Sequence, residues 1–322
     1  MKSAILFLVF NRVEPTRKVF EAIRQARPAR LYVAADGPRQ HQPGEYELCE
    51  ETRNFATQVD WPCEVKTLFR EKNLGCGKAV SEAITWFFEQ EEQGIILEDD
   101  SLPHATFFRF CDELLERYRD DERVAAISGD NFQKKNWRIE QSYYFSIYFR
   151  SWGWATWRRA WQHYDWGLRQ WPSLRTTSWL MDLFNDPAAA RYWQRMFDRV
   201  YAGQIDTWDY QWTYSCWIQS QLTVLPLVNL VTNIGFTDRA THVRDPLNAQ
   251  ANLPVLTMEF PLQHPLTMIR NFAADRYDTR HVFGVRPYWV EQTRALLRSG
   301  YRHLPDGIQR GIARLRAHAR TI

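Results

Sequence analysis

The chain has 322 residues, a length that fits two units of roughly 150 residues or one large α/β domain with an appendage. Hydrophobic residues make up 45% of it and charged residues 25%, which excludes intrinsic disorder as the main state. Its net charge of +3 is too small to indicate a nucleic-acid partner.

The five cysteines show no CxxC spacing and no nearby paired histidines. We therefore expect reduced thiols in the core of a cytoplasmic protein rather than disulfides or a zinc site. The first apolar run, Ala4–Phe10, is short, ends in Asn11-Arg12 and lacks a small-residue cleavage site, so it indicates a buried strand and not a signal peptide. No run approaches the roughly 20 apolar residues that span a bilayer.

Short apolar runs alternate with amphipathic segments over the first 130 residues. The runs predict five strands that are buried on both faces, namely Ala4–Phe10, Leu31–Ala35, Cys63–Phe69, Gly94–Leu97 and Val124–Ser128. The segments between them predict four helices, with apolar faces at Val19, Phe20 and Ile23, at Leu48, Phe55 and Val59, at Ala79, Val80, Ala83, Ile84 and Phe87, and at Phe107, Phe108, Cys111, Leu114 and Leu115. This alternation predicts an α/β fold with a mainly parallel sheet flanked by helices.

In such a sheet the ligand site lies beyond the carboxyl ends of the strands. Three predicted strands end in polar residues: Asn11-Arg12, Asp36-Gly37 and Glu98-Asp99-Asp100. Three consecutive carboxylates repel one another unless they are solvated or share a cation, and hard oxygen ligands of this kind suit Mg²⁺ or Mn²⁺. The alternative interpretation is an acidic turn before the helix that starts near Pro103.

Two nucleotide-binding motifs are absent, since no GxGxxG follows the first strand and no P-loop pattern occurs. The turn Gly75-Cys76-Gly77-Lys78 precedes a predicted helix, where backbone N–H groups or the lysine could meet a phosphate. An ordinary helix-start turn explains the same residues.

Tryptophan marks the second part of the chain: 12 of the 15 lie between Trp137 and Trp217. Trp154, Trp157 and Trp161 recur at the spacing of one helix face, which favours a role in the core. Tryptophan faces also stack on the apolar face of sugars, so an aromatic-rich region suits a carbohydrate ligand.

The order of these motifs resembles that of nucleotide-sugar glycosyltransferases of the GT-A (Rossmann-like) fold. The Glu98-Asp99-Asp100 form is most similar to the N-acetylglucosaminyltransferase I type, and bacterial sugar transferases share the general pattern. Gly153-Trp154 before the Arg- and Trp-rich segment Ala155–Trp161, interpreted as a helix, resembles a Gly-Trp-led helix of that family. Thr232–His242 resembles the loop that closes over the donor.

The resemblance implies a metal-dependent, inverting enzyme that transfers a sugar from a UDP-sugar, such as UDP-GlcNAc, to a saccharide or glycolipid of the bacterial envelope. It implies Asp100 as the Mn²⁺ or Mg²⁺ ligand, Asp99 as a metal- or ribose-side partner and Glu98 near the donor sugar. A late histidine, His242, would touch the metal or the diphosphate, although a loop histidine is as easily plain surface. Further donor contacts are assigned to Asn11, Arg12, Asp36, Lys78 and Arg239, with Asp36 accepting from uracil or, alternatively, capping its own turn.

Trp208-Asp209 resembles the family's Trp-Asp-Asp segment, in which an aspartate is the base. Here Tyr210 replaces the second acid. We expect Asp209 as the base and Asp206, three residues earlier, as the second candidate; the alternative is that either acid caps a helix. Trp208 and Trp212 are four residues apart beside this base and are the expected acceptor contacts.

These expectations divide the chain into a nucleotide-sugar-binding half (1–130), an aromatic-rich acceptor and catalytic region of the same GT-A domain (131–260) and a helical extension (261–322). Residues 294–322 hold seven Arg and one acid, Asp306. This basic tail is either a peripheral contact with the inner membrane or a solvated terminal helix. A non-catalytic nucleotide-sugar or glycan-binding protein on the same fold is the alternative function; a nucleotidylyltransferase would carry a glycine-rich loop after the first strand, which is missing.

Overall fold

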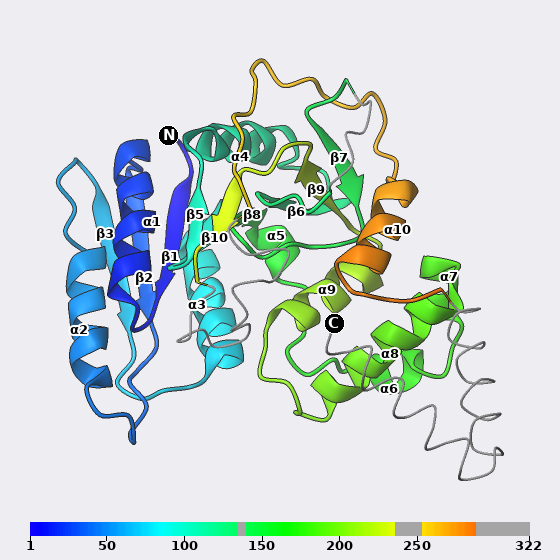
Figure 1. Ribbon diagram of the computed structural model, residues 1–322, viewed down its shortest axis with the longest axis horizontal. Coiled ribbons are helices and arrows are strands. Elements are labelled where there is room, and N and C mark those ends of the chain that lie inside the picture. Colours follow the sequence, from blue (N-terminus) through cyan, green and yellow to red (C-terminus); the bar gives the residue numbers. More distant parts are fainter. Residues whose placement is uncertain (134–139, 236–252, 288–322) are drawn as a thin grey trace, which may run out of the picture.

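A computed structural model describes residues 1–133, 140–235 and 253–287 of the chain. Its centre is an eight-stranded sheet in the order β3-β2-β1-β4-β8-β6-β9-β7, with β3 at one edge and β7 at the other (Figure 1). The strands are β1 (Ala4–Val9), β2 (Arg30–Ala35), β3 (Glu64–Phe69), β4 (Gln93–Glu98), β6 (Val124–Ser128), β7 (Tyr143–Ser146), β8 (Trp154–Trp157) and β9 (Leu222–Pro226). All five strands predicted from apolar runs are present, but the predicted burial on both faces is wrong for β3, which lies at the sheet edge and is only partly buried.

The sheet is mixed but mainly parallel. Strands β3, β2, β1 and β4 pair in parallel, and so do β6 and β9. Strand β8 is inserted antiparallel between β4 and β6, and β7 is antiparallel to β9 at the edge. The predicted fold class, α/β with a mainly parallel sheet flanked by helices, is confirmed.

Strand β1 explains why the apolar runs are continuous. Its six residues are all buried, and successive side chains point to opposite faces of the sheet. Ile5 and Phe7 pack in one core and Leu6 and Leu8 in the other. Because helices cover both faces, each position of the strand has to be apolar.

Helices α1 (Val13–Ala26), α2 (Glu45–Ala56) and α4 (Ala105–Arg117) lie on one face, and α3 (Cys76–Gln90) lies on the other. The predicted apolar faces of α1 and α4 are buried. The prediction for α2 is wrong in part, because the helix ends before Val59 and buries Glu45, Cys49 and Arg53. The two charged side chains in this set, Glu45 and Arg53, turn inward to hold neighbouring loops. Glu45, for example, accepts hydrogen bonds from Arg39.

The predicted helix 155–161 is wrong in its first half. Trp154 and Trp157 lie on β8, and α5 is only the short turn Arg158–Trp161. On a strand, Trp154 and Trp157 face opposite sides of the sheet, and they pack in different cores. The three tryptophans are buried, as expected, although their helical spacing is coincidental.

The remaining helices are α6 (Trp171–Leu174), α7 (Trp179–Phe184), α8 (Pro187–Tyr201), α9 (Asp209–Ile218) and α10 (Phe272–His281). Helices α6–α9 gather below the β8–β7 half of the sheet, and α10 lies beside β7 and β9 (Figure 1). A small two-stranded sheet pairs β5 (Ser101–Pro103) with β10 (Val231–Asn233). Residues from β1 to α9 share one core cluster.

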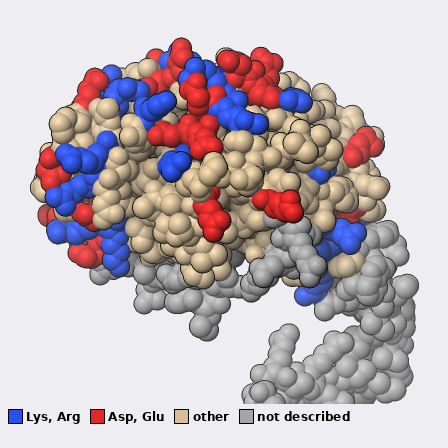
Figure 2. Space-filling model, turned by 90° about the horizontal axis from the view of Figure 1, so that it is seen from above, with Lys and Arg blue, Asp and Glu red and all other residues tan. Residues whose placement is uncertain are grey.

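Acidic and basic side chains are interspersed over the described surface seen from above (Figure 2), in keeping with the small net charge of +3. Within the described ranges, no helix combines the length and the apolar character needed to cross a membrane. Arg239, His242 and the basic tail 294–322 lie outside the described residues.

Candidate functional site

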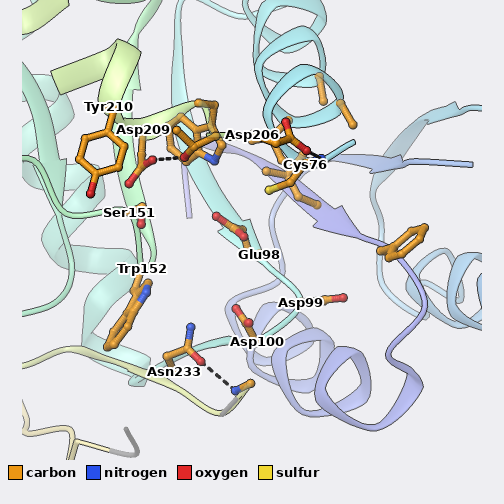
Figure 3. A pocket seen from close by; sticks show the side chains of 18 of the residues that line it. Cys76, Glu98, Asp99, Asp100, Ser151, Trp152, Asp206, Asp209, Tyr210 and Asn233 are labelled. Carbon is orange, nitrogen blue, oxygen red and sulfur yellow. Dashed lines mark hydrogen bonds between the residues drawn. The ribbon is translucent and has the colours of Figure 1, made fainter. Parts of the chain in front are cut away.

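A cavity of about 760 Å³ opens at the carboxyl ends of the sheet strands. The segments that follow β1, β2, β4 and β6 line it on the sheet side. Residues 148–152, 205–210 and 282–283 line it from the aromatic side (Figure 3). The prediction that strand ends gather at one edge is thus confirmed, and the opposite wall comes from parts of the chain far away in sequence.

The acidic triplet lies where β4 leaves the sheet. Strand β1 pairs with β4, so Arg12, which follows β1, reaches the triplet and forms ion pairs with Asp99 and with Asp100, the latter at 2.8 Å from Nη1 to Oδ2. Burial raises the pKa of Asp99, and the Arg12 charge opposes that shift. The Asp100 side chain is 13% exposed and that of Asp99 is 3% exposed, so Asp100 is the more accessible carboxylate.

Gly235 closes this corner from the side of β10. A Cβ atom on Gly235 would lie 2.2 Å from Asp100 Oδ2 and 2.9 Å from Arg12 Nη1. Only a residue without a side chain lets the backbone pass this close to the ion pair. The backbone at Gly235, just after β10, therefore packs directly against the Arg12–Asp100 ion pair.

The donor set for a divalent cation is sparse. Among the residues that the structure describes, no three His, Cys, Asp or Glu side chains are placed to share a metal ion. Arg12 engages both Asp99 and Asp100, and Asp100, the more exposed of the two, is the acid that a cation could reach. One carboxylate suits Mg²⁺ when substrate phosphates and water complete its shell.

Two carboxylates face each other across the cavity. Glu98 projects into its centre, between Asp100 and Asp209 (Figure 3). Burial, with the nearby charges of Asp100 and Asp99, raises the pKa of Glu98, and Asp209 acts in the same direction. Asp209 lies in the first turn of α9 and accepts a hydrogen bond from the Thr207 hydroxyl. Glu98 therefore holds its proton more readily than an exposed glutamate does.

Asp206 has a different environment. Its carboxylate accepts hydrogen bonds from the backbone N–H groups of Cys76 (3.1 Å) and Gly77 (2.9 Å). It therefore caps the amino end of α3 from 130 residues away in sequence. The Gly75–Lys78 turn thus binds a carboxylate of its own chain. Lys78 does not line the cavity and pairs with Glu82 at 3.7 Å.

Asp36 lines the cavity with its carboxylate already bound. It accepts hydrogen bonds from the backbone N–H groups of Gly37 (2.9 Å), Leu74 (3.0 Å) and Gly75 (3.1 Å). This geometry matches the turn-capping interpretation. Asn11 points away from the cavity and donates to Glu45 at 2.8 Å.

The two tryptophans expected at the acceptor are separated by the structure. Trp208 lines the cavity and stacks on Trp154 with ring centroids 5.5 Å apart. Trp212 is fully buried against Trp161, at 5.0 Å between centroids, and does not line the cavity. Trp212 is therefore a core residue, because α9 turns it toward β8 and leaves it no surface for an acceptor.

The sequence did not predict several residues of the cavity, among them Asp130, Arg150 and Phe283. Asp130 follows β6 and would have been found by the same strand-end rule that selected Asp36. Arg150 and Phe283 come from irregular segments after β7 and α10. No local pattern marks these two, since only the tertiary fold brings them to the cavity.

No protein-family model and no curated protein matches the sequence. Among solved structures, the chain is similar to S. aureus TarS 1-349, with 11% identity over 70% of this chain and 58% of that chain and a TM-score of 0.38. It is similar to HddC from Yersinia pseudotuberculosis, with 10% identity over 49% and 77% of the two chains and a TM-score of 0.30. A UDP-glucose pyrophosphorylase complexed with UDP-glucose gives 11% identity over 44% and 65% and a TM-score of 0.26.

Proposed function

We propose that the protein is a nucleotide-sugar glycosyltransferase that moves a sugar from a UDP-sugar to a saccharide or glycolipid acceptor. The proposal is supported by the residues that the cavity at the strand ends brings together. It holds the Arg12–Asp99–Asp100 cluster next to the facing carboxylates Glu98 and Asp209. The first group suits a diphosphate with its cation, and the second suits proton transfer at a sugar hydroxyl.

The diphosphate requires positive charge in this corner. Arg12 supplies one fixed cation, but Asp99 and Asp100 already balance it. Asp100 would hold Mg²⁺ or Mn²⁺, which supplies the charge that neutralises the leaving UDP. Arg12 keeps the Asp100 carboxylate oriented toward the cavity, and its guanidinium presents N–H groups suited to phosphate oxygens.

The acceptor hydroxyl needs a base on the face opposite the leaving group if the transfer inverts the anomeric carbon. Asp209 fits this role because it lines the cavity and its carboxylate is oriented by Thr207. Asp206 is bound by two backbone N–H groups, which favours a structural role for it. Glu98, between Asp209 and Asp100, would hydrogen-bond the sugar that is transferred.

The test is the release of UDP from a panel of UDP-sugars, including UDP-GlcNAc, with Mn²⁺ and with EDTA. Slow cation-dependent hydrolysis of at least one donor is expected, because transferases of this kind use water when no acceptor is bound. Binding of UDP without any turnover would instead support the alternative, a non-catalytic nucleotide-sugar-binding protein.

A further inference from the structure

Asp130 is a buried acid that has no role in the proposed binding or transfer of the donor sugar. It follows β6, is 1% exposed and lines the cavity. Within the part of the chain that the structure describes, its Oδ1 atom has no hydrogen-bond partner. Buried carboxylate oxygens are almost always hydrogen-bonded, so the missing partner of this atom points to a bound ligand.

Arg150 lies beside Asp130 and is 6% exposed. Its guanidinium pairs with Asp278 of α10, at 2.6 Å from Nη2 to Oδ2, and its charge also acts on Asp130. The backbone N–H of Arg150 donates to Ser128 Oγ at 3.1 Å, which ties this segment to the end of β6. A hydrogen-bond acceptor and a donor thus stand side by side at the cavity wall.

Aromatic rings surround this pair. Phe132 packs edge-on against Trp152, with centroids 4.9 Å apart, and the Arg150 guanidinium lies 4.7 Å from the Phe132 ring centre and 5.4 Å from that of Phe283. Phe132, Trp152 and Phe283 are half-buried and line the cavity. Apolar ring faces beside a carboxylate and a guanidinium are the combination that binds the C–H face and the hydroxyls of a sugar.

Resting on the proposed function, we propose that Asp130, Arg150 and Trp152 form the acceptor subsite, and that it selects a neutral sugar ring. One hydroxyl donates to Asp130 Oδ1, and a neighbouring hydroxyl accepts from Arg150. Asp130 and Asp209 line the described cavity, whereas the charge of the Arg150 guanidinium is already balanced by Asp278, which lies outside the lining. Anionic rings, such as uronates and sugar phosphates, are therefore excluded by repulsion.

Saturation-transfer NMR tests the subsite directly. The wild-type protein with UDP and Mn²⁺ is mixed with methyl glycosides of glucose, galactose, mannose and N-acetylglucosamine, and separately with methyl glucuronide and methyl glucoside 6-phosphate. We expect saturation transfer to at least one neutral glycoside and at least fivefold less to both anionic ones. Asp130→Ala, which removes the hydrogen-bond acceptor, should abolish the neutral signal, whereas Asp165→Ala, which alters a buried aspartate outside the cavity, should retain it.

Calorimetry of UDP binding separates the two levels of the proposal. If the wild-type protein does not bind UDP, the proposed function is refuted. Normal UDP binding with no neutral glycoside bound, with anionic and neutral rings bound equally, or with the signal retained in Asp130→Ala would refute the subsite alone. If Asp130→Ala fails to fold, Trp152→Ala replaces it, and an undiminished sugar signal in that variant overturns the subsite.

Discussion

The two walls of the cavity are built on different principles. On the sheet side, several carboxylates are already bound by groups of the protein. Arg12 pairs with Asp99 and Asp100, and three backbone N–H groups donate hydrogen bonds to Asp36. On the aromatic side, packing dominates, and buried polar atoms are left without hydrogen bonds within the described residues. These include Trp154 Nε1, Trp193 Nε1 and Trp212 Nε1. Hydrogen bonds and ion pairs thus arrange most of the sheet side before a ligand arrives, whereas ring packing arranges the aromatic side.

The largest effect is expected from replacing Asp209, the proposed base on the aromatic side of the cavity. Asp209→Asn keeps the shape of the side chain and removes the proton acceptor. Transfer should fall by roughly 10²–10⁴-fold, while UDP affinity stays unchanged because the Arg12–Asp100 corner is intact. Rates from UDP release and affinities from calorimetry check both expectations.

Asp206 provides the matched control. Asp206→Ala removes the cap of α3 and should lower the free energy of unfolding by about 1 kcal/mol. Full transfer in Asp209→Asn, together with its loss in a stably folded Asp206→Asn, would move the base to Asp206.

The second prediction concerns the packing of the aromatic side. Trp154 is fully buried and stacks on Trp208, so Trp154→Ala should lower the free energy of unfolding by about 3–5 kcal/mol. Trp166 is 46% exposed, and Trp166→Ala should cost only about 0.5 kcal/mol. Urea denaturation of both variants measures the contrast, and equal losses would show that packing does not hold this wall.

The third prediction concerns Asp130 and the pH dependence of stability. Burial raises the pKa of Asp130 from 3.8 to about 7, with the Arg150 charge opposing and the Asp278 charge adding to the shift. Between these two values the folded state keeps a proton that the unfolded state releases. Stability is therefore lost as the pH rises through this window. Asp130→Asn removes this penalty.

Thermal melting of Asp130→Asn and wild type from pH 4 to pH 8 tests this. The two melting temperatures should be close at pH 4. As the pH rises toward 7, the melting temperature of the variant should increasingly exceed that of the wild type. The difference between the two proteins cancels the titration of the groups they share. A variant less stable than the wild type at every pH would make Asp130 a structural partner of Arg150.

The smallest effect is expected on the sheet side at Lys78. This side chain is exposed, pairs with Glu82 and does not line the cavity. Lys78→Ala should leave UDP affinity unchanged within about twofold, as surface ion pairs contribute little. A tenfold loss in calorimetry would mean that the α3 turn moves to meet the diphosphate.

The sheet side could be predicted because its information is local. Each apolar run forms a strand, and parallel pairing then brings the residues after the strands to one edge, as it does for Arg12 and Glu98. The rule would also have found Asp130, had it been applied to β6. The aromatic side could not be predicted in this way.

On that side, the positions of the residues depend on contacts that are distant in sequence. Trp154 and Trp157 carry helical spacing but lie on β8, because that strand is held between β4 and β6. Asp206 caps a helix 130 residues earlier, and Phe283 reaches the cavity only because α10 docks on the segment after β7 through Asp275 and Thr279. Neither periodicity nor spacing encodes such contacts.

Calorimetric titration of UDP into the wild-type protein, with Mn²⁺ and then with EDTA, tests the central claim most directly. The carboxylates of the Arg12–Asp99–Asp100 corner repel a diphosphate unless a cation lies between them. We expect clear binding with Mn²⁺, a loss of at least about tenfold in affinity, or 1.4 kcal/mol, with EDTA, and a similar loss in Asp100→Ala. Undiminished binding in EDTA would contradict the metal role of Asp100, and no binding under either condition would contradict the assignment of this cavity to a nucleotide sugar.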